Sequence, residues 1–93
     1  MAKQVSAAHI LVKTEKEAAS LKQRIYGGEK FADIAKKYSE CPSKSAGGDL
    51  GWFGRGQMVK EFENAAFSAD VGAVVGPVRT QFGWHLILIK DLR

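Results

Sequence analysis

Two histidines are the residues of this chain best suited to chemistry. His9 and His85 each lie in an apolar run with the alternation of a strand, so each imidazole belongs to a fixed face of a rigid element. A neutral imidazole donates from one nitrogen and accepts at the other, so two rings can form one directional hydrogen-bonded unit. First and last strands are often neighbours in a sheet, which favours contact between the rings. For either histidine alone, a buried ring bonded to a backbone group is the simpler interpretation.

Cys41 is the only cysteine, and it lies between the end of a predicted helix and a glycine-rich segment. It fits a small buried hydrophobe or a thiolate nucleophile activated by histidine. The sequence indicates no oxyanion hole and no third residue that would orient a base. Cys41, His9 and His85 are also possible zinc ligands, but no short spacing such as CxxC or HxxxH supports that hypothesis. We expect no metal and no cofactor.

The segment 47–58, GGDLGWFGRGQM, combines five glycines with large apolar side chains, unlike a flexible linker. This pattern predicts a short strand between tight turns, where backbone approaches another element closely. We interpret it as the floor of a binding groove. Leu50, Met58, Phe62 and Phe82 are the apolar residues nearest to it in sequence. Core packing would explain each of them, but methionine with two phenylalanines suits a compact apolar ligand such as a proline ring.

The elements that must position these residues follow from hydrophobic periodicity. Strands are predicted at 5–12, 50–53, 76–80 and 84–89, and helices after Thr14, at 29–39 and at 59–67. Thr14 and Glu17 form a capping box, Gly27 ends the first helix, and residues 43–48 are predicted to be a polar loop. The order is β-α-α-β-α-β-β. Helices on one face of a small, mostly antiparallel sheet would make an α+β domain.

Composition limits the remaining possibilities. The 93 residues, 45% hydrophobic and 26% charged, predict one globular domain over residues 1–93. No stretch approaches the roughly 20 apolar residues of a membrane span, and the N-terminus lacks the apolar part of a signal peptide. The net charge of +4 is spread along the chain, so we expect neither a nucleic-acid partner nor a membrane partner. We also expect the chain to be a monomer. One cysteine favours the cytoplasm, although an excised domain of an exported protein would look the same.

Three segments resemble the parvulin family of peptidyl-prolyl cis-trans isomerases. They are AAHILVK (7–13), GGDLGWFGRGQMVKEFENAAF (47–67) and GPVRTQFGWHLI (76–87), in the order found in the family. The short format is similar to that of small single-domain bacterial parvulins such as peptidyl-prolyl isomerase C. The resemblance implies the parvulin fold, an FKBP-like superfold with a four-stranded, mostly antiparallel sheet and helices packed around it.

The resemblance also implies a role for each matching residue. The catalytic positions would be His9, Cys41, Thr80 and His85. The substrate-binding positions would be Leu50, Gln57, Met58, Phe62 and Phe82. In this scheme the histidines lie paired beneath the active site with Thr80 in their hydrogen-bond network, and Cys41 lies at the groove edge.

The chain differs from some members of the family in the segment that would bind a phosphorylated substrate. Phosphate-directed parvulins carry a longer basic loop after the first strand, whereas here residues 13–16 pass almost directly into a helix without an arginine cluster. We therefore predict no requirement for phosphorylation, and a preference for an apolar residue before proline because of Phe82 and Met58.

The function that these observations predict is isomerisation of Xaa-Pro bonds in unfolded or flexible segments of client proteins. Rotation breaks no covalent bond, so stabilising the twisted amide without a nucleophile is sufficient. The alternatives are a non-catalytic chaperone or peptide-binding domain that uses the same groove, and a cysteine hydrolase.

Overall fold

The computed structural model describes residues 3–93. In chain order the elements are β1 (Gln4–Val12), α1 (Glu15–Tyr26), α2 (Phe31–Tyr38), the 3-10 helix η1 (Pro42–Ala46), β2 (Asp49–Gly54), α3 (Lys60–Ser68), β3 (Val74–Thr80) and β4 (Gly83–Leu92). The predicted order is confirmed. Most of the segment 43–48 is not loop, because Pro42 has the backbone angle suited to a first helical position and η1 begins there. Within residues 3–93 no helix has the length and apolar character needed to span a membrane.

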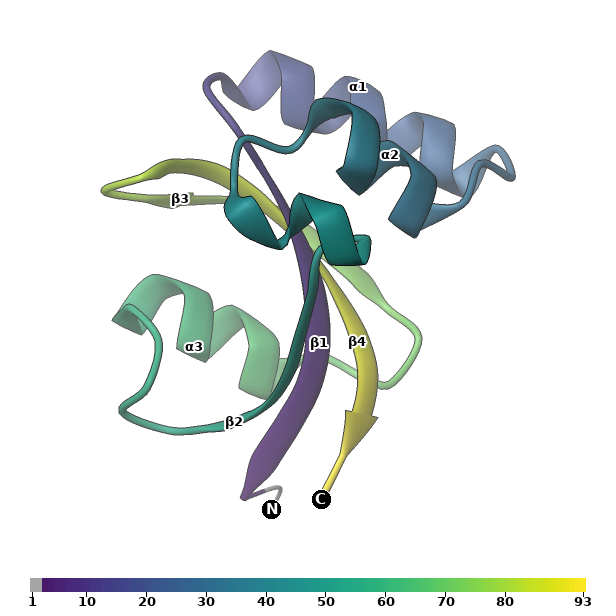
Figure 1. Ribbon diagram of the computed structural model, residues 1–93. Helices are drawn as coiled ribbons and strands as arrows, with labels where there is room; N and C mark the ends of the chain where they lie inside the picture. The colour runs from purple at the N-terminus through teal and green to yellow at the C-terminus, as the bar shows by residue number, and fades with distance from the viewer. Residues whose placement is uncertain (1–2) are drawn as a thin grey trace.

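The four strands form one antiparallel sheet in the order β2-β1-β4-β3 (Figure 1). The first and last strands are therefore neighbours, as expected from the sequence, and together they form the centre of the sheet. In their register Leu11 is opposite His85, and His9 is opposite Ile87. His9 and His85 are diagonal neighbours, which on one face of a sheet are close enough for their rings to meet.

The sheet has a hydrophobic core on each face. Beneath α1 and α2 the core includes Ala8, Ile10, Val12, Leu21, Ile34 and Leu86. Beneath α3 it includes Val5, Ala7, Phe53, Phe62, Ala66, Ile87 and Ile89. The expectation of helices on one face is therefore wrong; in Figure 1, α3 lies apart from α1 and α2. The physical reason is that β1 and β4 are apolar at both alternations, so both faces must be covered.

The connection between β1 and α1 is only two residues long. Thr14 is the N-cap of α1, and its Oγ1 accepts a hydrogen bond from the Glu17 backbone N–H at 3.1 Å. Gly27 ends the helix, with its N–H donating to the Gln23 carbonyl. Both predicted ends of α1 are confirmed. Because the connection from β1 to α1 is so short, it forms no long loop above the groove.

Gly48 is the point where the glycine-rich segment passes closest to β1. Its φ of +85° favours glycine, and a Cβ at this position would collide with the His9 carbonyl oxygen. The Gly48 carbonyl in turn accepts a hydrogen bond from the His9 backbone N–H at 2.9 Å. The predicted close approach of backbone is confirmed, and it holds the start of β2 beside His9.

Candidate active site

One apolar groove joins the candidate residues from distant parts of the chain. Its cavity is about 540 Å³, within the roughly 300–1,000 Å³ of small-ligand sites. It is lined by His9, Leu11, Glu40, Cys41, Pro42, Leu50, Gln57, Met58, Val59, Phe62, Phe82 and His85. Eight of the nine candidates thus meet in one cavity, and Thr80 lies behind it, hydrogen-bonded to His85.

The two imidazoles form a buried pair. His9 Nδ1 and His85 Nδ1 are 3.1 Å apart, and the rings stack with their centroids 5.3 Å apart. The residues are 6% and 4% exposed. Because one Nδ1 must donate and the other accept, the hydrogen bond is lost if both rings become charged.

Thr80 extends the hydrogen-bond network of this pair. Its Oγ1 accepts from the Phe82 backbone N–H at 3.1 Å and lies 2.7 Å from His85 Nε2. The roles depend on the tautomer: if the hydroxyl donates to His85 Nε2, His85 Nδ1 donates to His9, and if the hydroxyl accepts from Nε2, His9 Nδ1 is the donor. The same contacts connect the turn that carries Phe82 to the histidine pair.

Burial keeps both histidines neutral at pH 7. Removal from water lowers the pKa of His9 to about 4, and repulsion from a charged His85 acts in the same direction. Burial likewise lowers the pKa of His85. The pair therefore serves as a rigid, uncharged polar unit beneath an apolar groove.

Phe62 joins the groove wall to the histidine pair. Its ring meets His9 at 5.5 Å and His85 at 5.3 Å between centroids, edge-on in both cases. The residue is 3% exposed and lies on the face of α3 that covers the sheet. The wall and the imidazoles thus pack as one unit.

The glycine-rich segment contributes less of the groove than its sequence suggests. Leu50 lines the groove because it is the extra residue of a β-bulge between β1 and β2, where Gly51 has a φ of +68°. Phe53 instead lies in the core beneath α3. Trp52 stacks on the guanidinium of Arg93 at 4.1 Å, outside the groove. The interpretation of the whole segment as the groove floor is therefore wrong: only Leu50 and the residues after β2 reach the cavity.

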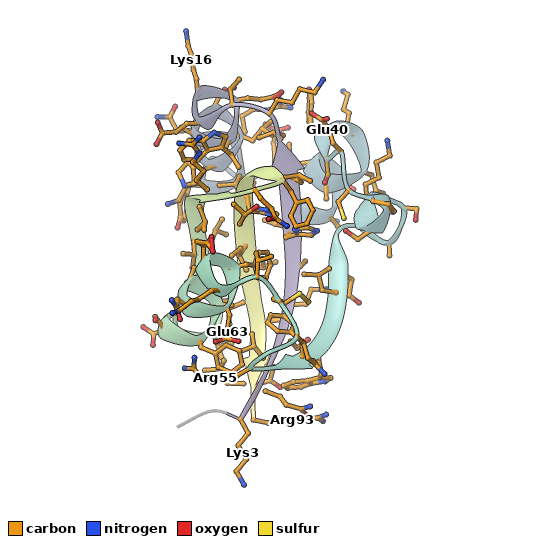
Figure 2. The ribbon with its side chains drawn as sticks, turned by 90° about the vertical axis from the view of Figure 1, so that its left-hand side faces the viewer. Lys3, Lys16, Glu40, Arg55, Glu63 and Arg93 are labelled. Carbon is orange, nitrogen blue, oxygen red and sulfur yellow. The ribbon has the colours of Figure 1, made fainter. Side chains whose placement is uncertain are left out.

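Four lining residues were not among the sequence candidates. Leu11 shares a strand face with His9, and that alternation could have identified it. Glu40 and Pro42 flank Cys41, and Val59 is the N-cap residue of α3. Of these, Glu40 matters most, because among residues 3–93 it is the only one with a charged side chain that lines the groove; Figure 2 shows it well apart from Arg55 and Glu63.

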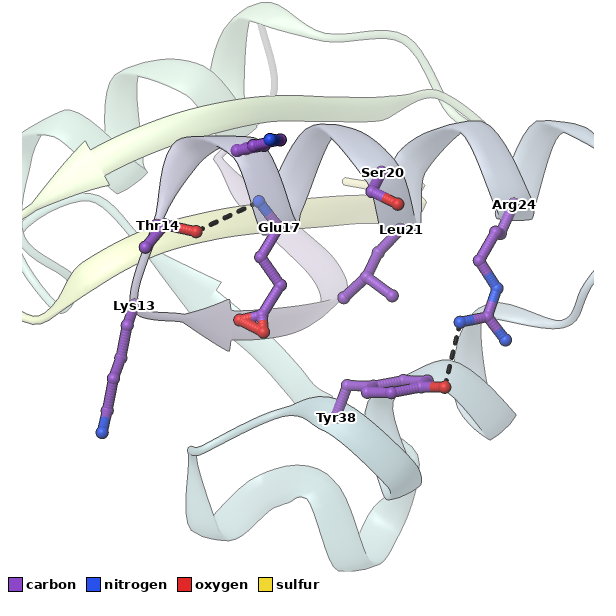
Figure 3. Close-up of a pocket in the computed structure, with 8 residues that line it drawn as sticks. Lys13, Thr14, Glu17, Ser20, Leu21, Arg24 and Tyr38 are labelled. Carbon is purple, nitrogen blue, oxygen red and sulfur yellow. Dashed lines mark hydrogen bonds between the residues drawn. The ribbon is translucent and has the colours of Figure 1, made fainter.

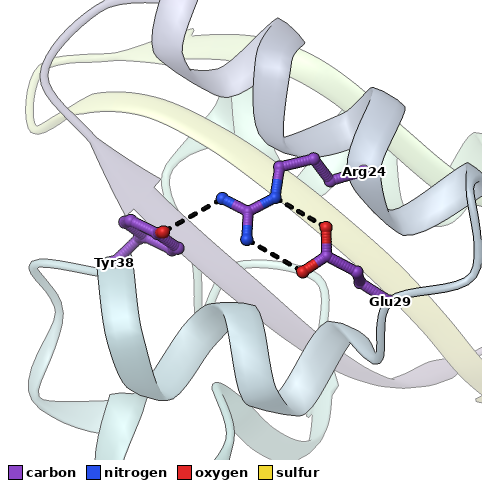
Figure 4. A network of polar contacts seen from close by, with 3 residues as sticks. All are labelled: Arg24, Glu29 and Tyr38. Carbon is purple, nitrogen blue, oxygen red and sulfur yellow. Dashed lines mark hydrogen bonds and ion pairs between the residues drawn. The ribbon is translucent and has the colours of Figure 1, made fainter.

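A second cavity, of about 580 Å³, lies on the surface of α1 away from the histidines (Figure 3). It is lined by Lys13, Thr14, Lys16, Glu17, Ser20, Leu21, Arg24 and Tyr38. Its arginine is already engaged: Arg24 forms two hydrogen bonds with the Glu29 carboxylate, at 2.6 and 2.8 Å, and one with the Tyr38 hydroxyl (Figure 4). The lysines that follow β1 therefore line this cavity and not the groove.

Comparison with known proteins gives a consistent family. The model of the PPIC-type PPIase domain matches residues 3–91. The foldase protein PrsA of Geobacillus sp. (strain WCH70) is 52% identical over 88 residues, which are 94% of this chain and 32% of that protein. The chaperone SurA of Chromobacterium violaceum is 45% identical over 102 residues, covering 100% of this chain and 24% of that protein. The chain thus spans about a third or less of these relatives.

Solved structures that match over nearly their full length include a parvulin structure. The solution structure of NmPin, the parvulin of Nitrosopumilus maritimus, has a TM-score of 0.88 and 38% sequence identity, covering 98% of this chain and 99% of that one. The crystal structure of PrsA from Bacillus cereus has a TM-score of 0.94 and 47% identity, covering 99% of this chain and 36% of that one.

Proposed function

The chain belongs to the PPIC-type peptidyl-prolyl cis-trans isomerase family, the parvulins, and we propose that its groove is the site that accelerates rotation about Xaa-Pro bonds. The observation that carries the proposal is a single apolar cavity in which Met58 and Phe62 lie next to a buried histidine pair. Such a cavity fits the ring of proline and leaves the preceding carbonyl at its edge.

To accelerate the rotation, the groove has to bind the twisted form of the amide more tightly than the planar forms; it does not need a reactive group. The barrier to rotation is about 20 kcal/mol, because amide resonance is lost in the twisted state. A thousandfold acceleration requires the groove to bind that state about 4 kcal/mol more tightly than the planar forms. No bond to the substrate has to form or break.

The groove residues supply this preference by position. Leu50, Met58 and Phe62 hold the ring and exclude water from the bond, which disfavours the charge-separated resonance form. The carbonyl oxygen then rotates past Cys41, which is partly exposed at the groove edge. The histidine pair keeps the base of the groove rigid.

Substituting Cys41 separates this mechanism from covalent catalysis. We expect Cys41→Ser and Cys41→Asp to retain kcat/KM within about threefold, since neither change empties the ring pocket. The measurement is a protease-coupled assay with a Leu-Pro peptide. A loss of about a thousandfold in both folded variants would favour a thiolate nucleophile.

Phosphate before proline should hinder the reaction. In the described part of the chain, Glu40 is the only residue with a charged side chain that lines the groove, and its carboxylate would repel a phosphoserine. We expect kcat/KM for a phosphoserine-proline peptide to be about tenfold lower than for the unmodified peptide. Glu40→Gln should narrow the difference, and Glu15→Gln, at an exposed site on α1, should not. Equal or faster turnover of the phosphopeptide would contradict the proposal.

The clients we propose are proline-containing segments of unfolded or flexible proteins. The names of the relatives, foldase and chaperone, support binding to client proteins. Isomerisation rates for peptides that differ only before proline should be highest for leucine and phenylalanine, because Phe82 and Met58 add apolar surface to the groove. Equal isomerisation rates for all residues before proline would contradict this preference. The monomeric state and the cytoplasmic location stay predictions.

The name of the SurA relative also favours a second candidate, a groove that holds client segments without accelerating rotation. The two functions differ in one result, since a holding domain binds the same peptides but leaves their isomerisation rate unchanged.

A further inference from the structure

The connection between β2 and α3, residues 55–59, carries Gln57 and Met58 to the groove. Two backbone N–H groups at its start donate to side chains. Gly54 N–H donates to Gln57 Oε1 at 2.8 Å, and Gly56 N–H donates to Glu63 Oε1 at 2.6 Å. The conformation of this wall of the groove therefore depends on side-chain contacts, one of which comes from α3.

The carboxylate of Glu63 is well placed for that contact. Its second oxygen lies 3.2 Å from Arg55 Nη1, and Figure 2 shows the two residues side by side. The Arg55 guanidinium in turn lies over the Phe67 ring, 4.5 Å from the ring centroid. The Glu63 side chain is 14% exposed, whereas that of Arg55 is 52% exposed. Glu63 also lies in the first turn of α3, where the helix dipole favours a negative charge. Such a partly buried, charge-assisted hydrogen bond is stronger than an exposed ion pair.

Glu63 follows Phe62 directly in α3, so one turn of helix contacts both sides of the pocket. The Phe62 ring forms the wall beside the histidines, and the Glu63 carboxylate binds the backbone that leads to Met58. The bound residue, Gly56, has a φ of +89°, and a glycine at this position is otherwise free to change conformation. The carboxylate therefore limits how far Met58 can move from Phe62.

We propose that Glu63 is a positioning residue of the proline pocket: by binding Gly56 N–H and Arg55 it keeps Met58 and Gln57 in place against the substrate ring. This inference rests on the proposed isomerase function, which it deepens. Glu63 does not line the groove, so its effect on turnover passes through the connection.

The side chain of Met58 reports this positioning directly. The chain has two methionines, Met1 and Met58. A spectrum of 13C-labelled methionine ε-methyl groups therefore contains few signals, and the signal that disappears in Met58→Leu is that of Met58. In Glu63→Ala the Met58 methyl should lose order on the fast timescale and shift toward the random-coil position. Glu61→Ala, an exposed residue in the same turn, should leave it unchanged. An unaltered Met58 methyl in folded Glu63→Ala would overturn the proposal, whether or not the chain is an isomerase.

Turnover provides the second readout. We expect Glu63→Ala to lower kcat/KM by about tenfold, because a displaced Met58 no longer holds the ring and excludes water from the bond. Glu63→Gln should recover most of the activity, since its amide oxygen still accepts from Gly56 N–H. Equal losses in Glu63→Gln and Glu63→Ala, with the Met58 methyl unchanged in both, would contradict positioning through Gly56.

Discussion

Replacing Phe62 by alanine should lower kcat/KM for a Leu-Pro peptide by about a hundredfold or more. The ring is a wall of the groove and packs edge-on against both imidazoles, so its loss enlarges the pocket and removes support from His9 and His85. The same change should lower the free energy of unfolding by about 3–5 kcal/mol, the usual cost of truncating a buried phenylalanine. Activity must therefore be measured under conditions where circular dichroism shows the variant to be folded.

Phe67 provides the matched control. It packs on Phe53 with ring centroids 6.1 Å apart, in the same core, but it does not line the groove. Phe67→Ala should thus lose stability without a comparable loss of kcat/KM. Full activity in folded Phe62→Ala, or equal losses in the two variants, would show that the proline pocket lies elsewhere.

Acid should destabilise the fold through the histidine pair. The pKa of His9 is about 4 in the folded chain and about 6.5 in the unfolded chain, so between these values the unfolded state binds more protons. The free energy of unfolding should therefore be highest above pH 6.5 and fall as the pH drops toward 4. His9 alone accounts for about 3 kcal/mol of that loss, and the lowered pKa of His85 adds to it in the same direction.

Urea unfolding at a series of pH values, together with NMR titration of the imidazole signals, measures this dependence. Thr80→Val serves as a comparison, since it removes the hydroxyl beside His85 Nε2 but leaves both rings in place. A free energy of unfolding that stays constant between pH 7 and 4.5, or either ring titrating in the folded chain at its ordinary pKa, would contradict a buried neutral pair.

The sequence predicted the central strands well because their signal is local. Alternation along β1 and β4 places His9 and His85 on the face that carries the groove, and the pairing of first and last strands brings them together. Thr14 and Gly27 likewise mark the ends of α1 through short-range hydrogen bonds. These features need only a few neighbouring residues to be recognised.

Other features depend on tertiary contacts. Leu50 reaches the groove through a β-bulge, which strict alternation cannot predict. Glu40 enters the lining because its backbone N–H bonds to the Leu11 carbonyl, a contact between α2's end and β1. The contact of Glu63 with Gly56 likewise requires a turn and a helix to be placed together. The placement of α3 on the second face of the sheet likewise depends on tertiary contacts.

Exchange NMR of a Leu-Pro peptide, with the chain present at a small fraction of the peptide concentration, tests the central claim most directly. Cis and trans signals of the free peptide interconvert over tens to hundreds of seconds, too slowly for exchange peaks. We predict exchange peaks between the two isomers when the chain is added, and their disappearance with folded Phe62→Ala. Signals that shift through binding while interconversion remains as slow as in the free peptide would show that the groove holds proline without helping its amide to turn.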